Sequence, residues 1–156
     1  MAKVYAGIGS RSTPETVLQK FISIASLLEI RGFHLRSGGA LGADQAFEKG
    51  VAQPHMKEVL RPRDATEAAM EIAARIHPAW HMCDEPARRL HGRNVQIILG
   101  RDLQDPVMFV LAYTESPDRG GTRTGLVLAK DYSKPVFNFA VPGTEEAFMK
   151  YYTESL

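Results

Sequence analysis

The sequence has 156 residues, which is the size of one globular domain with its own hydrophobic core. Hydrophobic residues make up 44% and charged residues 24%, and a net charge of +1 excludes a global field that attracts nucleic acid or an anionic membrane. The single cysteine excludes an internal disulfide, and no apolar run approaches the roughly 18 residues of a membrane span. We therefore expect one cytoplasmic domain over residues 1–156, with no membrane partner and a local site for any anion.

The first elements follow from apolar runs and helix signals. Residues 4–8 form a short apolar run, which predicts a strand buried on both faces. Residues 12–32 carry apolar positions at helical spacing and predict a helix, with Ser12 or Thr13 as its cap and Gly32 as its stop.

Strands and helices then alternate to the end of the chain. Such alternation implies right-handed crossovers and a parallel sheet covered on both faces. We expect an α/β fold, a Rossmann-like three-layer sandwich with a mainly parallel sheet. The remaining predicted strands are residues 33–36, 56–60, 107–113 and 135–139, and the remaining predicted helices are residues 40–49, 65–76, 85–100, 122–132 and 144–152.

Glycines gather at three of the predicted strand-to-helix junctions, at residues 7–11 (GIGSR), 37–40 (SGGA) and 120–122 (GGT). These junctions lie at the carboxyl edge of a parallel sheet, where free N–H groups at helix starts bind anions. For any one loop, a tight turn explains the glycines equally well. The three together indicate a shared phosphate site, although none fits the P-loop or the dinucleotide-binding pattern.

Polar side chains near these junctions are candidates for the same site. Arg11 and Arg123 offer forked contacts to phosphate, and Ser10 and Ser37 offer hydroxyl groups. Asp44 lies one helical turn past the second glycine junction, where it would bind a ribose hydroxyl, order the loop, or simply favour the helix dipole.

A basic cluster precedes the most apolar strand, within the predicted helix of residues 85–100. At helical spacing Arg89 and Arg93 share a face, and Asn94 turns away from it. This face would form either a solvated basic surface or a positive rim for a nucleotide.

Other residues receive weaker functional interpretations. Tyr113 ends the most apolar strand, where it would contact a ligand or cap the core. His77, His81 and His91 are not expected to bind a metal, because no carboxylate or cysteine accompanies them at ligand spacing. For the same reason we expect no role for Cys83.

The motifs GSR, SGGALGAD, the RN of HGRNVQIILG, and GGTRTG occur in an order that resembles the SLOG superfamily. This superfamily joins DNA-processing protein A to the "lonely guy" nucleotide phosphoribohydrolases, and the resemblance covers about residues 4–143. The sequence is most similar to short stand-alone members carried by phages and plasmids. The resemblance implies a homo-oligomer, no cofactor, and a phosphate pocket of Gly9, Ser10, Arg11, Ser37, Gly38, Gly39, Asp44, Arg93, Asn94, Gly120, Gly121 and Thr122.

The function that we expect is binding of a nucleotide or nucleotide-derived phosphate ligand, a small-molecule partner, with turnover left open. One alternative is hydrolysis of the N-glycosidic bond of a nucleoside 5′-monophosphate. The glutamate that those hydrolases use corresponds to Leu126 or Val127, so Glu115 or Asp118 would have to act as the catalytic acid. The other alternative is binding of single-stranded DNA through a local patch of Arg61, Arg63, Arg88, Arg89 and Arg93.

Overall fold

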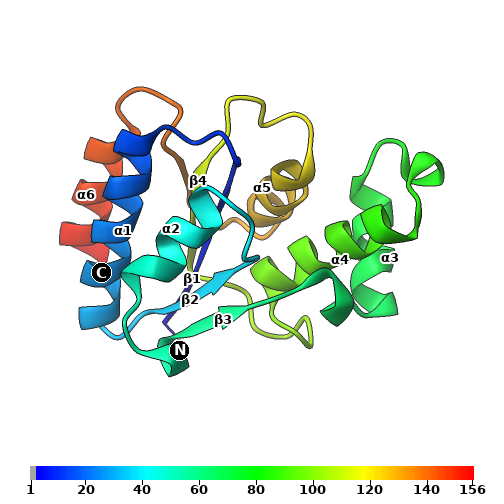
Figure 1. Ribbon diagram of the computed structural model, residues 1–156, viewed down its shortest axis with the longest axis horizontal. Coiled ribbons are helices and arrows are strands. Elements are labelled where there is room, and N and C mark those ends of the chain that lie inside the picture. The colour runs from blue at the N-terminus through cyan, green and yellow to red at the C-terminus, as the bar shows by residue number, and fades with distance from the viewer. Residues whose placement is uncertain (1–2) are drawn as a thin grey trace.

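The computed structural model describes residues 3–156 and contains a five-stranded sheet in the order β3-β2-β1-β4-β5, in which all neighbouring strands are parallel (Figure 1). The predicted Rossmann-like sandwich is confirmed, and the predicted strands are present with ends shifted by at most two residues. The strands are β1 (Val4–Gly9), β2 (His34–Ser37), β3 (Lys57–Val59), β4 (Phe109–Tyr113) and β5 (Val136–Asn138).

Helices lie on both faces of this sheet (Figure 1). One layer contains α1 (Glu15–Ile30), α2 (Ala43–Gly50) and α6 (Thr144–Ser155), and the other contains α3 (Glu67–Ile76), α4 (Glu85–Leu99) and α5 (Gly121–Asp131). In the second layer, α3 packs on the outer side of α4 (Figure 1). Three short 3-10 turns, η1 (Pro54–Met56), η2 (Pro62–Asp64) and η3 (Trp80–Met82), were not predicted, because three residues carry no periodicity. No helix in the described range is long and apolar enough to cross a membrane.

Side-chain alternation along the strands separates two hydrophobic cores. Tyr5 of β1 faces α1 and α2, where it stacks on Phe109 with ring centroids 5.5 Å apart. Its neighbour Ala6, with Ile8, belongs to the core beneath α3, α4 and α5. Successive residues of a strand point to opposite faces of the sheet. The side chain of the last residue of each strand therefore lies on either the α1 and α2 side or the α4 and α5 side of the sheet.

The starts of α1 and α2 differ from the sequence-based expectation. Neither Ser12 nor Thr13 caps α1: Pro14 occupies the N-cap position, and the Thr13 hydroxyl donates to the Ser10 carbonyl at 2.6 Å. Helix α2 starts at Ala43 rather than near residue 40, because Gly42, with φ of 87°, has a left-handed backbone that a right-handed helix excludes.

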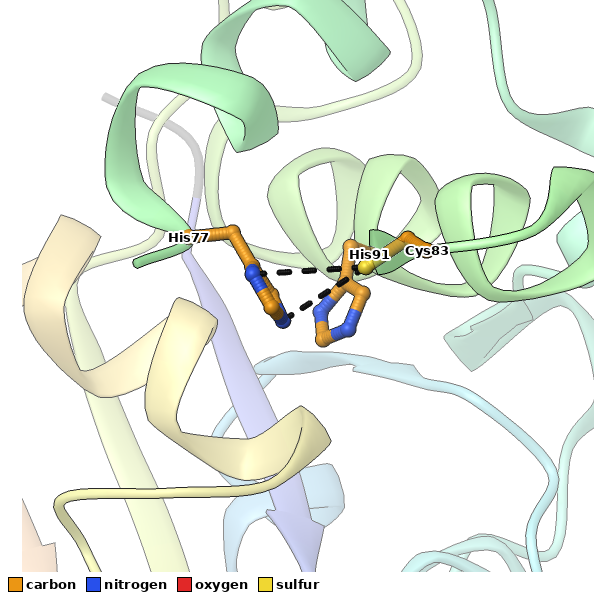
Figure 2. Close-up of side chains that lie close together, drawn as sticks. All are labelled: His77, Cys83 and His91. Atoms are coloured by element: carbon orange, nitrogen blue, oxygen red, sulfur yellow. Dashed lines mark hydrogen bonds between the residues drawn. The ribbon is translucent and has the colours of Figure 1, made fainter. Parts of the chain in front are cut away.

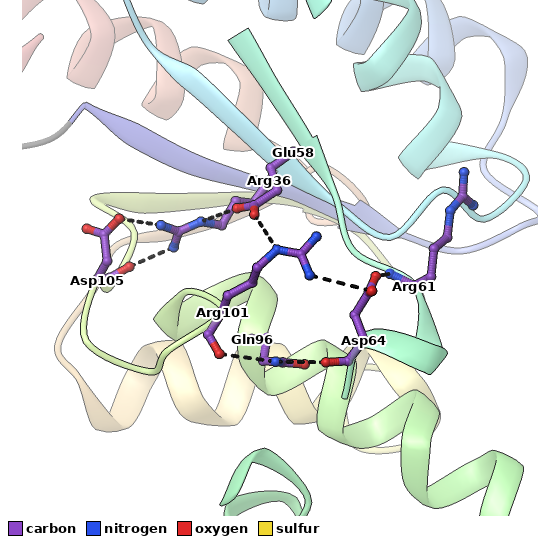
Figure 3. A network of polar contacts seen from close by, with 7 residues as sticks. All are labelled: Arg36, Glu58, Arg61, Asp64, Gln96, Arg101 and Asp105. Carbon is purple, nitrogen blue, oxygen red and sulfur yellow. Dashed lines mark hydrogen bonds and ion pairs between the residues drawn. The ribbon is translucent and has the colours of Figure 1, made fainter. Parts of the chain in front are cut away.

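A polar network fastens the loop after β3 to the sheet and to α4 (Figure 3). Arg36 of β2 is 5% exposed; it donates to the Asp105 carbonyl at 2.6 Å and also pairs with the Asp105 carboxylate. Glu58 of β3 lies between Arg36, at 3.5 Å, and Arg101, at 2.8 Å. Because Arg101 also pairs with Asp64 at 3.5 Å, the turn η2 is held at a fixed place beside the sheet.

We predict that Gly50→Ala destabilises the fold. A Cβ at Gly50 would lie 2.3 Å from the Ile22 carbonyl oxygen and 2.7 Å from the Ala25 Cβ, so α1 and α2 would have to separate. Overpacking of this kind costs about 1–3 kcal/mol of unfolding free energy, measured by urea titration. The exposed neighbour Lys49→Ala is the control, with an expected change within about 0.5 kcal/mol. Equal stability of the two variants would contradict the packing argument.

Candidate functional site

A cavity of about 180 Å³ lies at the carboxyl edge of the sheet, between the loops after β1 and β2, helix α4 and the start of α5. The three glycine junctions picked out from the sequence therefore meet at one place. The cavity is lined by Ile8, Gly9, Arg11, Ala40, Asp44, Leu90, Arg93, Asn94, Ile97, Gly121, Thr122 and Gly125.

The carboxylate of Asp44 connects the first two junctions. Its Oδ1 accepts the Gly9 N–H at 3.2 Å, and its Oδ2 accepts the Ala40 N–H at 3.3 Å. The side chain is 5% exposed, and burial raises the pKa of Asp44 to about 6, against the lowering effects of the Ala40 N–H and of the Arg93 charge. The Gly9 and Ala40 amides are thus already hydrogen-bonded to the Asp44 carboxylate and are not free to bind an external anion.

Arg93 and Asn94 of α4 join the remaining loops. Arg93 is 5% exposed, and its Nη1 donates to the carbonyls of Gly38 at 2.8 Å and Leu60 at 2.9 Å. Its Nε donates to the Asn94 Oδ1 at 2.8 Å, and the Asn94 amide donates to the Gly121 carbonyl at 3.0 Å. The pair therefore ties the loops after β2 and β3 to the first turn of α5.

The start of α5 supplies the amides that Asp44 does not occupy. Gly120, with φ of 81°, is the N-cap residue, and no side chain caps this 11-residue helix. Its first N–H groups have no intrahelical partner and carry partial positive charge. Gly121 and Thr122 of this turn line the cavity together with Arg11. Arg11 is exposed and its side chain makes no hydrogen bond or ion pair with another residue of the described chain, so its guanidinium is available for a ligand.

One face of α4 forms the cavity wall, and it differs from the face expected from the sequence. Arg93 and Asn94 both line the cavity, whereas Arg89, expected on the same face as Arg93, is 41% exposed and pairs with Glu85 at 2.9 Å. The apolar side chains at positions 90 and 97 complete the face at helical spacing. This 90-93-94-97 pattern was present in the sequence and would have identified the wall, including the two apolar residues that were missed.

Several predicted ligand residues lie outside the cavity lining. The Ser37 hydroxyl is buried against α2, where it hydrogen-bonds to Glu48 at 3.0 Å. The Ser10 hydroxyl pairs with that of Ser12 at 2.8 Å. Arg123 donates to the Ile76 carbonyl at 3.0 Å, at the end of α3.

Strand alternation explains the position of Tyr113, whose side chain belongs to the core on the α1 and α2 side of the sheet. Its hydroxyl donates to Glu115 at 2.7 Å. Glu115 and Asp118 are exposed and do not line the cavity, so the structure does not bring the two candidate catalytic acids to it. Of the cavity-lining residues, Asp44 is the one that carries a carboxylate.

Gly38 and Gly39 lie close to arginine side chains of the same chain. A Cβ at Gly38 would lie 2.8 Å from Arg93 Nη1 and 2.9 Å from Asp44 Oδ2. At Gly39, with φ of 73°, it would lie 2.2 Å from Arg61 Nη1. Position 39 therefore requires glycine because of its left-handed backbone, and glycine at position 38 leaves room for the buried Arg93 guanidinium and the Asp44 carboxylate.

A second group of side chains lies apart from this cavity, at the start of α4. His77, Cys83 and His91 have ligand atoms within 4.8 Å of one another. The expectation that no cysteine accompanies the histidines is thus wrong, because Cys83 lies beside two of them in the folded chain. Linear spacing missed the group because the turn η3 folds Cys83 back toward His77, with Sγ 3.7 Å from Nε2.

We predict a pH dependence of stability caused by Asp44. Because its pKa is about 6 when folded and about 3.9 when unfolded, the folded state binds this proton more tightly, and its contribution to the unfolding free energy falls as the pH rises from 4 to 6. Asp44→Asn should remove this slope, which reaches at most about 1.4 kcal/mol per pH unit, in urea titrations across that range. The exposed Asp118→Asn should keep the wild-type slope. A slope unchanged by Asp44→Asn would refute the assignment.

Comparison with known proteins gives a structural neighbour and no sequence relative. No family model matches the chain, and no curated protein matches it significantly in sequence. A solved structure of DNA processing protein A from Helicobacter pylori, which concerns its single-stranded DNA binding mode, matches with a TM-score of 0.60 and 20% identity. The match covers 88% of this chain and 65% of that chain, so this chain spans somewhat less than two thirds of its neighbour. The likeness establishes that the two proteins share a Rossmann-type fold.

Proposed function

We propose that the cavity binds the phosphate group of a nucleotide or a nucleotide-derived ligand. The observation that carries this proposal is the convergence of an uncapped helix N-terminus with the unpaired Arg11 guanidinium in one cavity. Amides at a helix start and guanidinium groups are the donors that bind phosphate most often. Arg11 would supply one forked contact, and the Gly121 and Thr122 amides would supply the others.

The size of the cavity limits how much of the ligand it encloses. Pockets that enclose a whole drug-sized ligand are about 300–1,000 Å³. At about 180 Å³, this cavity accommodates a phosphate with part of its sugar and leaves the base at the rim. Leu90 and Ile97 offer an apolar wall to sugar carbons, and the Asp44 carboxylate offers an acceptor to a sugar hydroxyl.

The proposal does not include hydrolysis of the ligand. A glycosidase needs a carboxyl group close to the scissile bond, and Glu115 and Asp118 are not in the cavity lining. Leu126 and Val127, which stand where related hydrolases carry a glutamate, offer no ionisable group. Passive binding therefore accounts for the cavity with fewer assumptions than turnover does.

We predict that Arg11→Ala weakens binding of nucleoside 5′-monophosphates at least about tenfold, because it removes charge-assisted hydrogen bonds worth about 1.5–3 kcal/mol. Isothermal titration calorimetry with the four common monophosphates, the matching nucleosides and inorganic phosphate would measure this. Nucleosides without phosphate should not bind. Arg75→Ala removes an exposed arginine outside the cavity lining and should bind as wild type does. Binding that is equal for both variants, or absent for every phosphate compound, would contradict the proposal.

Single-stranded DNA is a second candidate, favoured by the DNA binding of the structural neighbour and by the exposed Arg61 and Arg63. The other arginines of the expected basic patch argue against DNA binding, because they already have contacts within the protein. Arg93 is buried, Arg89 is paired with Glu85, and the Arg88 guanidinium lies 5.3 Å from the Trp80 ring centroid. A DNA phosphate would use the same cavity as a nucleotide phosphate.

We predict that oligonucleotide length distinguishes the two candidates. If the ligand is a single nucleotide, affinity stays constant from a dinucleotide to a 20-mer apart from a statistical factor. If the ligand is single-stranded DNA, affinity rises with length, decreases steeply with salt, and weakens in Arg61→Ala. Fluorescence anisotropy at several salt concentrations makes this measurement, and an absence of binding at low salt would exclude DNA.

A further inference from the structure

We propose that His77, Cys83 and His91 form a binding site for a borderline-soft divalent metal ion of the zinc class. The three residues come from separate segments: His77 follows α3, Cys83 follows the turn η3, and His91 lies in the second turn of α4. Figure 2 shows the thiol and the two imidazole rings turned toward one another in the space between these segments. Two imidazoles and a thiolate are a donor set that zinc prefers.

The distances are close to those of an occupied site. The Cys83 Sγ lies 3.7 Å from the His77 Nε2, and all three ligand atoms lie within 4.8 Å. Zinc–nitrogen bonds of about 2.0 Å and zinc–sulfur bonds of about 2.3 Å give tetrahedral ligand separations of roughly 3.3–3.5 Å for two nitrogens and one sulfur. The widest separation in the group therefore has to shorten by about 1.3–1.5 Å when the metal binds.

His91 has a buried hydrogen-bond partner on its Nδ1 side. It is 7% exposed, and its Nδ1 lies 3.1 Å from the hydroxyl of Thr124, which is 1% exposed. A proton on Nδ1 donated to this hydroxyl leaves the Nε2 lone pair for the metal, the arrangement by which neighbouring groups fix a ligand histidine.

His77 requires one local rearrangement. Its Nδ1 accepts the Ala79 N–H at 3.0 Å, which leaves the proton of the neutral ring on Nε2. Coordination through Nε2 transfers that proton to Nδ1 and opens the Ala79 contact. The change is confined to the connection between α3 and α4, where Trp80 packs beside the group, with its ring centroid 6.2 Å from that of His77.

Metal binding would cross-link the segment that connects α3 and α4 to helix α4. Coordination releases the Cys83 proton to solvent and links His77 and Cys83 to His91. Through Thr124 the link reaches the first turns of α5, whose start lines the phosphate cavity. Three protein ligands leave a fourth position for water or another donor.

The test is a titration of the reduced 156-residue protein with Co²⁺ and with Zn²⁺. Co²⁺ should bind with one equivalent per chain and give the near-ultraviolet charge-transfer band of a cobalt–thiolate bond, and Zn²⁺ should displace it. Zinc should also protect Cys83 from a thiol reagent. Cys83→Ser should abolish the band, and Thr124→Val should weaken binding about tenfold by removing the partner of His91.

The matched control is His81→Gln, which removes an exposed histidine of the same turn and should leave the band and the affinity unchanged. Wild-type protein alkylated at Cys83 tests the thiol without any substitution, so a variant that fails to fold does not decide the outcome. The absence of a thiolate band, or equal metal binding by Cys83→Ser and wild type, would overturn the proposal.

Discussion

The hydrogen bonds of the buried Asp44 carboxylate are the constraint on which the carboxyl edge depends. One oxygen accepts from Gly9 and the other from Ala40, so a single side chain holds the loops after β1 and β2 together. Both amides are partly buried, and this carboxylate supplies their hydrogen-bond acceptors. The glycines of the second loop then admit Arg93 and Arg61, whose guanidinium groups lie where a Cβ would be. Much of the glycine-rich sequence thus serves contacts within the protein.

This arrangement divides the positive groups of the edge into two sets. Amides of the first two loops, and the Arg93 Nη1 group, are used by the protein itself. Arg11 and the amides at the start of α5 are not used in this way, and they line the cavity beside the apolar face of α4. These remaining donors line one small cavity, which suits a compact, highly charged group such as phosphate better than an extended polymer. A longer ligand would have to enter through one of its phosphates.

The fold could be predicted from the sequence because its strands are apolar and its helices are punctuated by glycine and proline. Alternation of these elements leaves few topologies for the sheet. The location of the cavity could also be predicted, since the carboxyl ends of parallel strands share one edge. The roles of its members could not, because a strand residue such as Tyr113 changes face with a one-residue shift in register. Nor does linear spacing reveal that η3 brings Cys83 to two histidines, since that contact is made across a turn.

The most direct measurement is a crystal structure of the protein with a bound nucleoside 5′-monophosphate. We expect the phosphate within hydrogen-bonding distance of the Thr122 amide and the Arg11 guanidinium, with Asp44 still accepting from Gly9 and Ala40. A phosphate that displaces the Asp44 carboxylate from those two amides, or that binds outside the cavity, would contradict this division between the protein's own contacts and those kept for a ligand.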